Sequence, residues 1–217
     1  MDFAAARQNM VDCQILPNRV DDERVVDAMS EVPREAFVGE DMAGVAYIDE
    51  ALPLGNDRFV MEPMIIARLL QTAALSPDDV ALTIGCGSGY AAAVLARIVN
   101  TVVAVESDKA LAQKAGENLS ALGLDNVAIV EGDMAGGNAD QGPYDVIFFD
   151  GAVSEVPAAI TDQLAEGGRL VAIITAPGGV GSARLITRHG GVLSHRDAFD
   201  AGTPLLPGFE AESAFVF

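Results

Sequence analysis

A glycine-rich turn between an apolar segment and an alanine-rich one constrains the fold of this chain more than any other feature. Residues 80–84 (VALTI) are short and mostly apolar, as expected of a strand buried on both faces, and residues 90–99 are compatible with a helix. Gly85, Gly87 and Gly89 alternate between them. Such a turn leaves unpaired amides at a helix N-terminus and lets a polar or anionic ligand group lie against bare backbone.

An acid at the end of the next apolar segment indicates the class of ligand. Residues 101–105 are apolar and β-branched, and they are followed by Glu106, 17 residues after Gly89. In a doubly wound sheet this carboxylate lies at the carboxyl end of the neighbouring strand, where it can accept hydrogen bonds from both hydroxyls of a ribose. The turn and Glu106 together predict a nucleoside-binding unit.

The spacing of the glycines favours S-adenosylmethionine over a nicotinamide dinucleotide. A dinucleotide fingerprint has its third glycine where this chain has Tyr90. After a third apolar segment, residues 127–131, Asp133 is placed to accept the adenine amino group and Met134 to pack on the ring. A fourth segment, residues 144–149, ends in Asp150. One acid at a strand end is usually only solvated, whereas three at the ends of successive segments favour a ligand site. The residues expected to contact the donor are Gly85, Cys86, Gly87, Ser88, Gly89, Glu106, Ser107, Asp133, Met134 and Asp150.

The order of the segments predicts a single α/β domain over residues 1–217. Its core, residues 79–217, is expected to be a doubly wound, Rossmann-like sheet, mostly parallel with an antiparallel C-terminal strand. Residues 1–78 are expected to form an N-terminal helical cap and a loop on the acceptor side. The expected helices span residues 3–15, 22–32, 62–74, 90–99, 108–122 and 156–164, and the last two strands span residues 170–175 and 212–217.

The composition excludes several classes of partner. The formal net charge of -19 disfavours nucleic acid and anionic membranes. The two cysteines, Cys13 and Cys86, are far apart and form no metal-binding or disulfide motif. No apolar stretch of about 18 residues and no signal-peptide pattern is present, so we expect a cytoplasmic protein.

Several stretches resemble the protein-L-isoaspartate O-methyltransferase family. The similarity runs from about Met10 to Thr175 and includes residues 10–15 (MVDCQI), 22–29 (DERVVDAM), 32–38 (VPREAFV), 51–55 (ALPLG), 85–90 (GCGSGY), Glu106, 132–133 (GD) and 164–170 (LAEGGRL). The resemblance implies methyl transfer from S-adenosylmethionine to the free carboxylate of isoaspartyl residues in damaged proteins. No general base is needed, because a carboxylate is already ionised near neutral pH, and the enzyme mainly aligns the reactants and excludes water.

Three positions depart from the family pattern. Met61 stands at the family's active-site serine, and a thioether cannot donate a hydrogen bond. Thr83 replaces an acid that precedes the glycines, and Asp150 replaces a small hydroxyl residue. We hypothesise that Asp150 compensates for Thr83 by facing the positively charged end of the donor.

These departures leave alternatives open. The first alternative to isoaspartyl methylation is a family member with a changed acceptor, which is another carboxylate or a hydroxyl. The second is a module that binds the donor without efficient catalysis. A metal-dependent O-methyltransferase is disfavoured, because residues 170–179 lack the carboxylate that would complete a magnesium site with Asp150. Arg58, the nearest cation to Met61 in the sequence, is a candidate for attracting an acceptor carboxylate.

Overall fold

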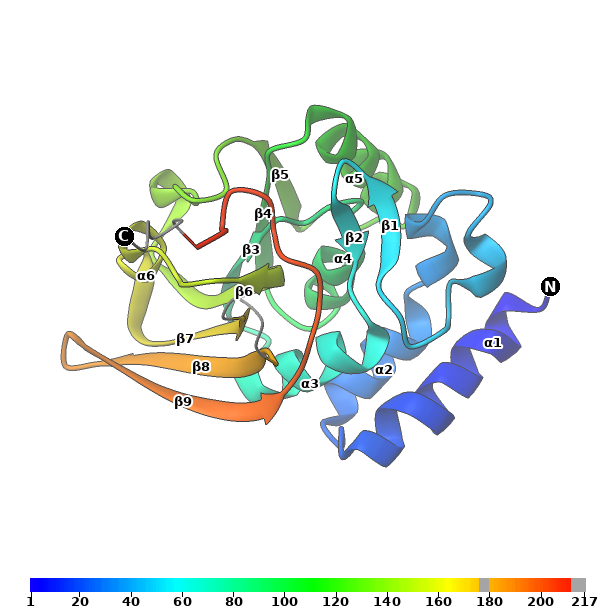
Figure 1. Ribbon diagram of the computed structural model, residues 1–217, viewed down its shortest axis with the longest axis horizontal. Helices are drawn as coiled ribbons and strands as arrows, with labels where there is room; N and C mark the ends of the chain where they lie inside the picture. Colours follow the sequence, from blue (N-terminus) through cyan, green and yellow to red (C-terminus); the bar gives the residue numbers. More distant parts are fainter. Residues whose placement is uncertain (176–179, 212–217) are drawn as a thin grey trace, which may run out of the picture.

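A seven-stranded sheet forms the centre of the protein in a computed structural model that describes residues 1–175 and 180–211. The strand order is β5-β4-β3-β6-β7-β8-β9, with parallel pairing from β5 to β7 and antiparallel pairing of β8 and β9 (Figure 1). This confirms the doubly wound, mostly parallel sheet predicted from the sequence. The strands are β3 (Val80–Ile84), β4 (Thr101–Glu106), β5 (Val127–Glu131), β6 (Tyr144–Val153), β7 (Leu164–Ile174), β8 (Ser182–His189) and β9 (Val192–Asp200).

The antiparallel part of the sheet differs in place from the prediction. The strand expected at residues 212–217 lies outside the described residues. The described antiparallel strands β8 and β9 come instead from residues 182–200, where the sequence shows little pattern because most of β9 is exposed. Strand β7 also begins earlier than predicted, at Leu164, which leaves only a short helix before it.

Helices precede the sheet and alternate with its strands. Carboxylates cap three of them, as Asp2, Asp22 and Asp108 accept hydrogen bonds from backbone amides in the first turns of α1, α2 and α5. The α-helices are α1 (Phe3–Met10), α2 (Glu23–Glu31), α3 (Pro63–Ala73), α4 (Tyr90–Ala96), α5 (Lys109–Ala121) and α6 (Ala158–Thr161). Shorter turns are the π-helical η1 (Val11–Ile15) and the 3-10 segments η2 (Leu16–Asn18), η3 (Arg34–Phe37), η4 (Ala43–Val45) and η5 (Ala139–Gln141), and a hairpin is formed by β1 (Leu52–Gly55) and β2 (Arg58–Val60).

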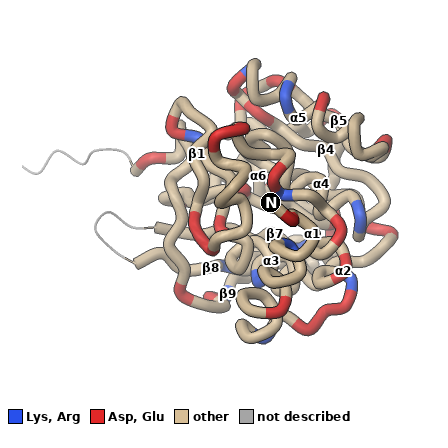
Figure 2. Tube along the Cα trace, turned by 90° about the vertical axis from the view of Figure 1, so that its right-hand side faces the viewer, with Lys and Arg blue, Asp and Glu red and all other residues tan. Residues whose placement is uncertain are grey.

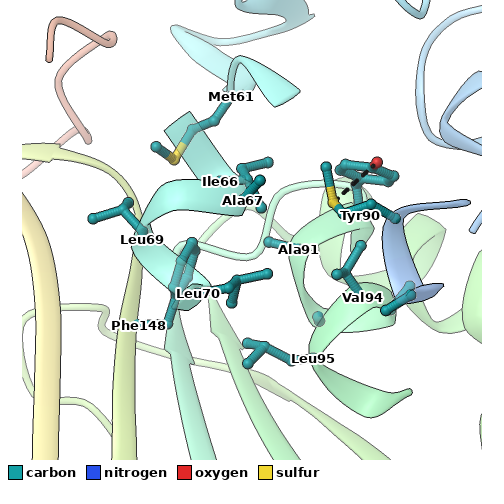
Figure 3. Close-up of a cluster of buried hydrophobic side chains, with 14 of the residues drawn as sticks. Met61, Ile66, Ala67, Leu69, Leu70, Tyr90, Ala91, Val94, Leu95 and Phe148 are labelled. Carbon is teal, nitrogen blue, oxygen red and sulfur yellow. Dashed lines mark hydrogen bonds between the residues drawn. The ribbon is translucent and has the colours of Figure 1, made fainter. Parts of the chain in front are cut away.

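Two apolar clusters cover the two faces of the sheet. Alternate residues of β6 point to opposite sides, so that Phe148 joins the cluster under the N-terminal helices while Phe149 joins the other. Figure 3 shows the first cluster, in which Leu70 of α3 lies beside Phe148 and Tyr90 of α4 belongs to the same cluster. The N-terminal helices therefore share a core with the sheet.

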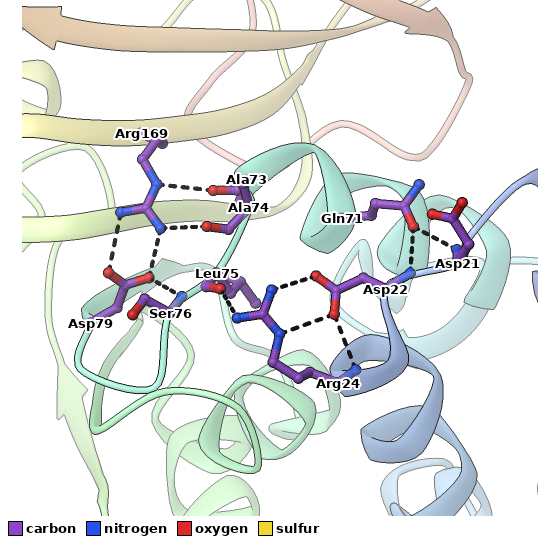
Figure 4. Close-up of polar contacts among 10 residues, drawn as sticks. All are labelled: Asp21, Asp22, Arg24, Gln71, Ala73, Ala74, Leu75, Ser76, Asp79 and Arg169. Atoms are coloured by element: carbon purple, nitrogen blue, oxygen red, sulfur yellow. Dashed lines mark hydrogen bonds and ion pairs between the residues drawn. The ribbon is translucent and has the colours of Figure 1, made fainter.

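Polar contacts also join the N-terminal segment to the sheet (Figure 4). Arg169 of β7 donates to the carbonyls of Ala73 and Ala74 at the end of α3, and it forms an ion pair with Asp79 at 2.6 Å. Arg24 of α2 donates to the carbonyl of Leu75. From this shared packing we propose that residues 1–78 and 79–217 form one domain.

Candidate functional site

The candidate site lies where β3, β4 and β6 end. Strands β4 and β5 follow β3 on one side and β6 lies on the other, so the strand order reverses between β3 and β6. Ligands of doubly wound folds bind in the crevice at such a reversal, outside the carboxyl ends of the strands. Gly85 follows β3 and Glu106 ends β4, as expected, but Asp150 does not end its strand: β6 continues to Val153, and Asp150 lies at the irregularity between Phe148 and Ala152.

The three glycines of the turn all have left-handed backbone angles. Their φ values are 76° at Gly85, 55° at Gly87 and 98° at Gly89, a region that glycine adopts readily. A Cβ on Gly89 would lie 3.2 Å from the Cβ of Ala115, so this glycine permits α4 and α5 to pack closely. Gly89 thus serves the fold, whereas Gly85 faces the crevice.

The carboxylate of Glu106 is fully buried and held by donors of the protein itself. Its Oε2 accepts hydrogen bonds from Arg58 Nη2 and from the Gly87 amide, both at 2.7 Å, and its Oε1 accepts one from the Asp108 amide at 3.0 Å. The same Arg58 nitrogen donates to the Gly85 carbonyl at 2.6 Å. Arg58 therefore lies in the crevice beside Gly85 and Glu106, and it is not in an open loop.

A segment near the C-terminus covers the crevice from the other side. We call residues 203–209 the strap. The strap is bonded to β6, since the Ala152 amide donates to Pro204 at 2.9 Å and the Leu206 amide donates to Ala152 at 2.8 Å. This fixes the Leu206 side chain over two glycines, with Leu206 Cδ2 2.8 Å and 2.6 Å from the positions that a Cβ would take on Gly85 and Gly151.

These contacts leave little room for a nucleoside. The cavity bordered by Arg58, Met61, Asp150 and Leu206 measures about 10 Å³, whereas pockets for small ligands usually enclose some 300–1,000 Å³. The residues present in this conformation therefore do not fit a bound donor. A larger hollow of about 460 Å³ opens beside Ser88, on the part of the turn away from Asp150, and the predicted acids do not line it.

Asp150 borders the crevice, whereas Thr83 is fully buried within β3. Asp150 Oδ1 and Thr83 Oγ1 are buried without a hydrogen-bond partner among the described residues. Burial raises the pKa of Asp150 to about 7, against the opposing effect of Arg58 and Arg34. Burial thus favours the protonated form of the Asp150 carboxyl group.

The other predicted donor contacts are divided among three environments. Ser88 is buried and donates to the Phe37 carbonyl at 2.5 Å, which ties the turn to η3. Cys86 and Met134 are buried in apolar clusters, and burial raises the pKa of the Cys86 thiol. Ser107 and Asp133 are exposed at the edge, where Asp133 accepts from the Ala135 amide at 3.0 Å.

Met61 packs into the core and does not line an open pocket. Its side chain is 1% exposed and belongs to the first apolar cluster (Figure 3). Its carbonyl accepts a hydrogen bond from Arg34 Nη2 at 2.7 Å, and Arg34 Nε donates to the Ala46 carbonyl at the same distance. Arg34, which lies 4.8 Å from the centre of the Tyr90 ring, was missed by the sequence analysis. The one signal for Arg34 in the sequence was its position within the motif at residues 32–38.

Within residues 1–175 and 180–211, no group of three or more His, Cys, Asp or Glu side chains is arranged to hold a metal ion. In the same part of the chain, no helix is long and apolar enough to cross a membrane.

Comparison with known proteins points to one family. Residues 5–198 match the family Protein-L-isoaspartate(D-aspartate) O-methyltransferase. The chain is 44% identical over 171 residues to the protein-L-isoaspartate O-methyltransferase of Roseiflexus sp. (strain RS-1), covering 79% of this chain and 78% of that protein. With the enzyme of the same name from Methylorubrum extorquens (strain PA1), it shares 42% identity over 200 residues, covering 92% and 85% of the two chains.

Solved structures show the same fold. A protein-L-isoaspartate O-methyltransferase superposes with a TM-score of 0.82 at 28% identity, over 93% of this chain and 66% of that longer one. A Plasmodium falciparum protein described as a beta-aspartate methyltransferase, solved with S-adenosyl-L-homocysteine, superposes with a TM-score of 0.79 at 23% identity, over 95% and 98% of the two chains.

Proposed function

The chain belongs to the protein-L-isoaspartate(D-aspartate) O-methyltransferase family, and we propose that it transfers a methyl group from S-adenosylmethionine to the carboxylate of isoaspartyl residues in proteins. The observation that carries this function is the 42% identity to a protein-L-isoaspartate O-methyltransferase over 92% of the chain. The sheet order, the left-handed glycine turn and Glu106 at the end of β4 support the donor class.

The proposed acceptor is an anion, which determines what the site has to supply. An isoaspartyl carboxylate needs no base at neutral pH, so the enzyme has to position it and neutralise its charge. The chain has 32 Asp and Glu residues against 13 Lys and Arg residues, and the acidic positions occur along much of the trace in Figure 2. Isoaspartyl proteins or peptides would therefore be steered poorly by the overall field. Arg34 and Arg58, the cations nearest the crevice, are buried and already bonded to groups of the protein, so neither is free to bind an acceptor carboxylate in this conformation.

Met61 is the feature that limits this function. A buried thioether offers no hydrogen-bond donor to an acceptor carboxylate at the position of the family serine. We propose that methyl transfer still occurs, but that it depends on the alignment of the donor and receives no help from a hydrogen bond at position 61. We also propose a cytoplasmic location, which the composition supports.

The test is methyl transfer from labelled S-adenosylmethionine. The full chain is incubated with an isoaspartyl peptide and with the same peptide carrying a normal aspartyl residue, and labelled methyl ester is counted. Turnover with the isoaspartyl peptide alone supports repair chemistry. Turnover with other carboxylates or hydroxyl compounds only would mean a changed acceptor, and no turnover despite donor binding would leave a donor-binding module, so either result rejects the proposal.

A further inference from the structure

Arg58 is bonded to the carboxylate of Glu106, the group at the end of β4 that is expected to accept hydrogen bonds from a ribose. Glu106 has two carboxylate oxygens, and every hydrogen bond they accept comes from the described protein itself. The ion pair of Arg58 with Glu106 is almost completely buried, with the two side chains 3% and 0% exposed. Ribose hydroxyls cannot reach Glu106 Oε2 while the guanidinium remains there.

Leu206 fills the second half of the same crevice. It lies over Gly85 and Gly151, the two backbone positions nearest the reversal of strand order between β3 and β6. The strap is held in place by the bonds to Ala152 and by a hydrogen bond of 2.8 Å from Thr203 Oγ1 to Glu62 at the start of α3. A ligand on the bare backbone of the turn would have to displace Leu206.

Some buried polar atoms at the closed crevice have no hydrogen-bond partner among the described residues. They include Arg58 Nε and Asp150 Oδ1, on two residues that border the crevice. Each buried polar atom left unpaired costs free energy of the order of 1–3 kcal/mol. Polar groups of a ligand that paired with these atoms would repay part of the cost of opening the crevice.

We propose that Arg58 and Leu206 form an internal gate over the donor site. In the closed state Arg58 takes the position of the ribose on Glu106 and Leu206 covers Gly85 and Gly151, and S-adenosylmethionine binds only after both side chains have moved. This inference rests on the proposed function for the identity of the donor. It adds that the affinity for the donor is limited by the fraction of molecules in which the gate is open.

The gate has a measurable consequence for binding. When only a fraction of the molecules is competent to bind, the apparent dissociation constant is the intrinsic constant divided by that fraction. Removing either part of the gate raises this fraction. We therefore expect Arg58→Gln and Leu206→Ala to bind S-adenosylmethionine about tenfold or more tightly than the unchanged chain. This is the gain that results when the closed state is about tenfold more populated than the open state in the unchanged chain.

The test is calorimetric titration of the full chain with S-adenosylmethionine and with S-adenosylhomocysteine, which needs no turnover. Arg184→Gln and Leu193→Ala are the matched controls, because Arg184 forms a more exposed ion pair and Leu193 is 40% exposed on β9. Thermal unfolding establishes which variants are folded. Because Leu206→Ala keeps the ion pair of Arg58 and Glu106 intact, it decides the question if Arg58→Gln does not fold.

Tighter binding by the gate variants, with the controls equal to the unchanged chain, supports the gate. Equal or weaker binding by the folded gate variants overturns it, as does the absence of binding in every form. These outcomes are separable from the proposed function: gate variants that bind the donor but methylate nothing would reject the function and keep the gate. Tight binding and turnover by the unchanged chain, with no gain in the variants, would reject the gate alone.

Discussion

Replacing Asp150 with asparagine should change how the stability of the protein depends on pH. Asp150 is 5% exposed at the bulge of β6, and burial raises its pKa from the usual 3.8 to about 7. Asparagine has nearly the same shape and cannot ionise. The comparison therefore isolates the cost of ionising one buried carboxyl group.

The sign and size of this pH dependence follow from the pKa of Asp150 in the unfolded chain, 3.8, and in the folded chain, about 7. Below pH 3.8 the carboxyl group is protonated in both the folded and the unfolded chain, and it causes no pH dependence. Between pH 3.8 and about 7 the unfolded chain releases the proton while the folded chain keeps it, so stability falls as the pH rises. At about 1.4 kcal/mol per pKa unit, the full loss above pH 7 is about 4 kcal/mol.

The assay is urea unfolding of the unchanged chain and of Asp150→Asn at several values from pH 4 to pH 8. We expect Asp150→Asn to gain stability relative to the unchanged chain as the pH rises, by about 4 kcal/mol over the whole range. Asp162→Asn, at a side chain that is 79% exposed, is the control. A constant difference between Asp150→Asn and the unchanged chain across this range would refute the reasoning.

Two further predictions concern the core and the ion pairs. Met61→Ser removes a buried side chain from the first apolar cluster and should lower the free energy of unfolding by about 3 kcal/mol. The same substitution should raise kcat/KM for an isoaspartyl peptide. Loss of both stability and turnover would count against an acceptor role for this position. Arg169→Ala leaves the carboxylate of Asp79, 8% exposed, without its partner (Figure 4) and should cost about 3 kcal/mol in urea unfolding. Arg184→Ala breaks a more exposed pair and should cost less than about 1 kcal/mol; equal effects of the two substitutions would contradict this ranking.

Local patterns in the sequence were enough to predict the parallel sheet. The strands β3 and β4 are largely buried apolar runs, and β5 is an apolar run with half-buried and exposed residues. Gly89 and Asp108 mark the starts of the helices that follow β3 and β4. The β8–β9 hairpin was missed for a physical reason. Its outer strand is an edge strand with mostly exposed residues, so it has no alternation of buried apolar residues to detect.

The contacts that decide the state of the site could not be predicted in this way. Arg58 and Glu106 are 48 residues apart, and nothing in the periodicity around either residue specifies the other. Leu206 follows β9 in a segment with turn residues, and its place over Gly85 depends on pairing of the strap with β6. Such contacts are set by the tertiary fold.

The glycine turn shows why the sequence motif and the state of the site are separate questions. A glycine with positive φ at position 85 permits close approach by another group, and the motif does not specify which group approaches. In this protein the groups are Leu206 and Arg58, both within 3.0 Å of where a Cβ on Gly85 would lie. Gly85 is therefore required by the closed crevice as much as by a bound donor. We therefore propose that the glycines mark the place where the donor binds, while Arg58 and Leu206 determine when it can enter.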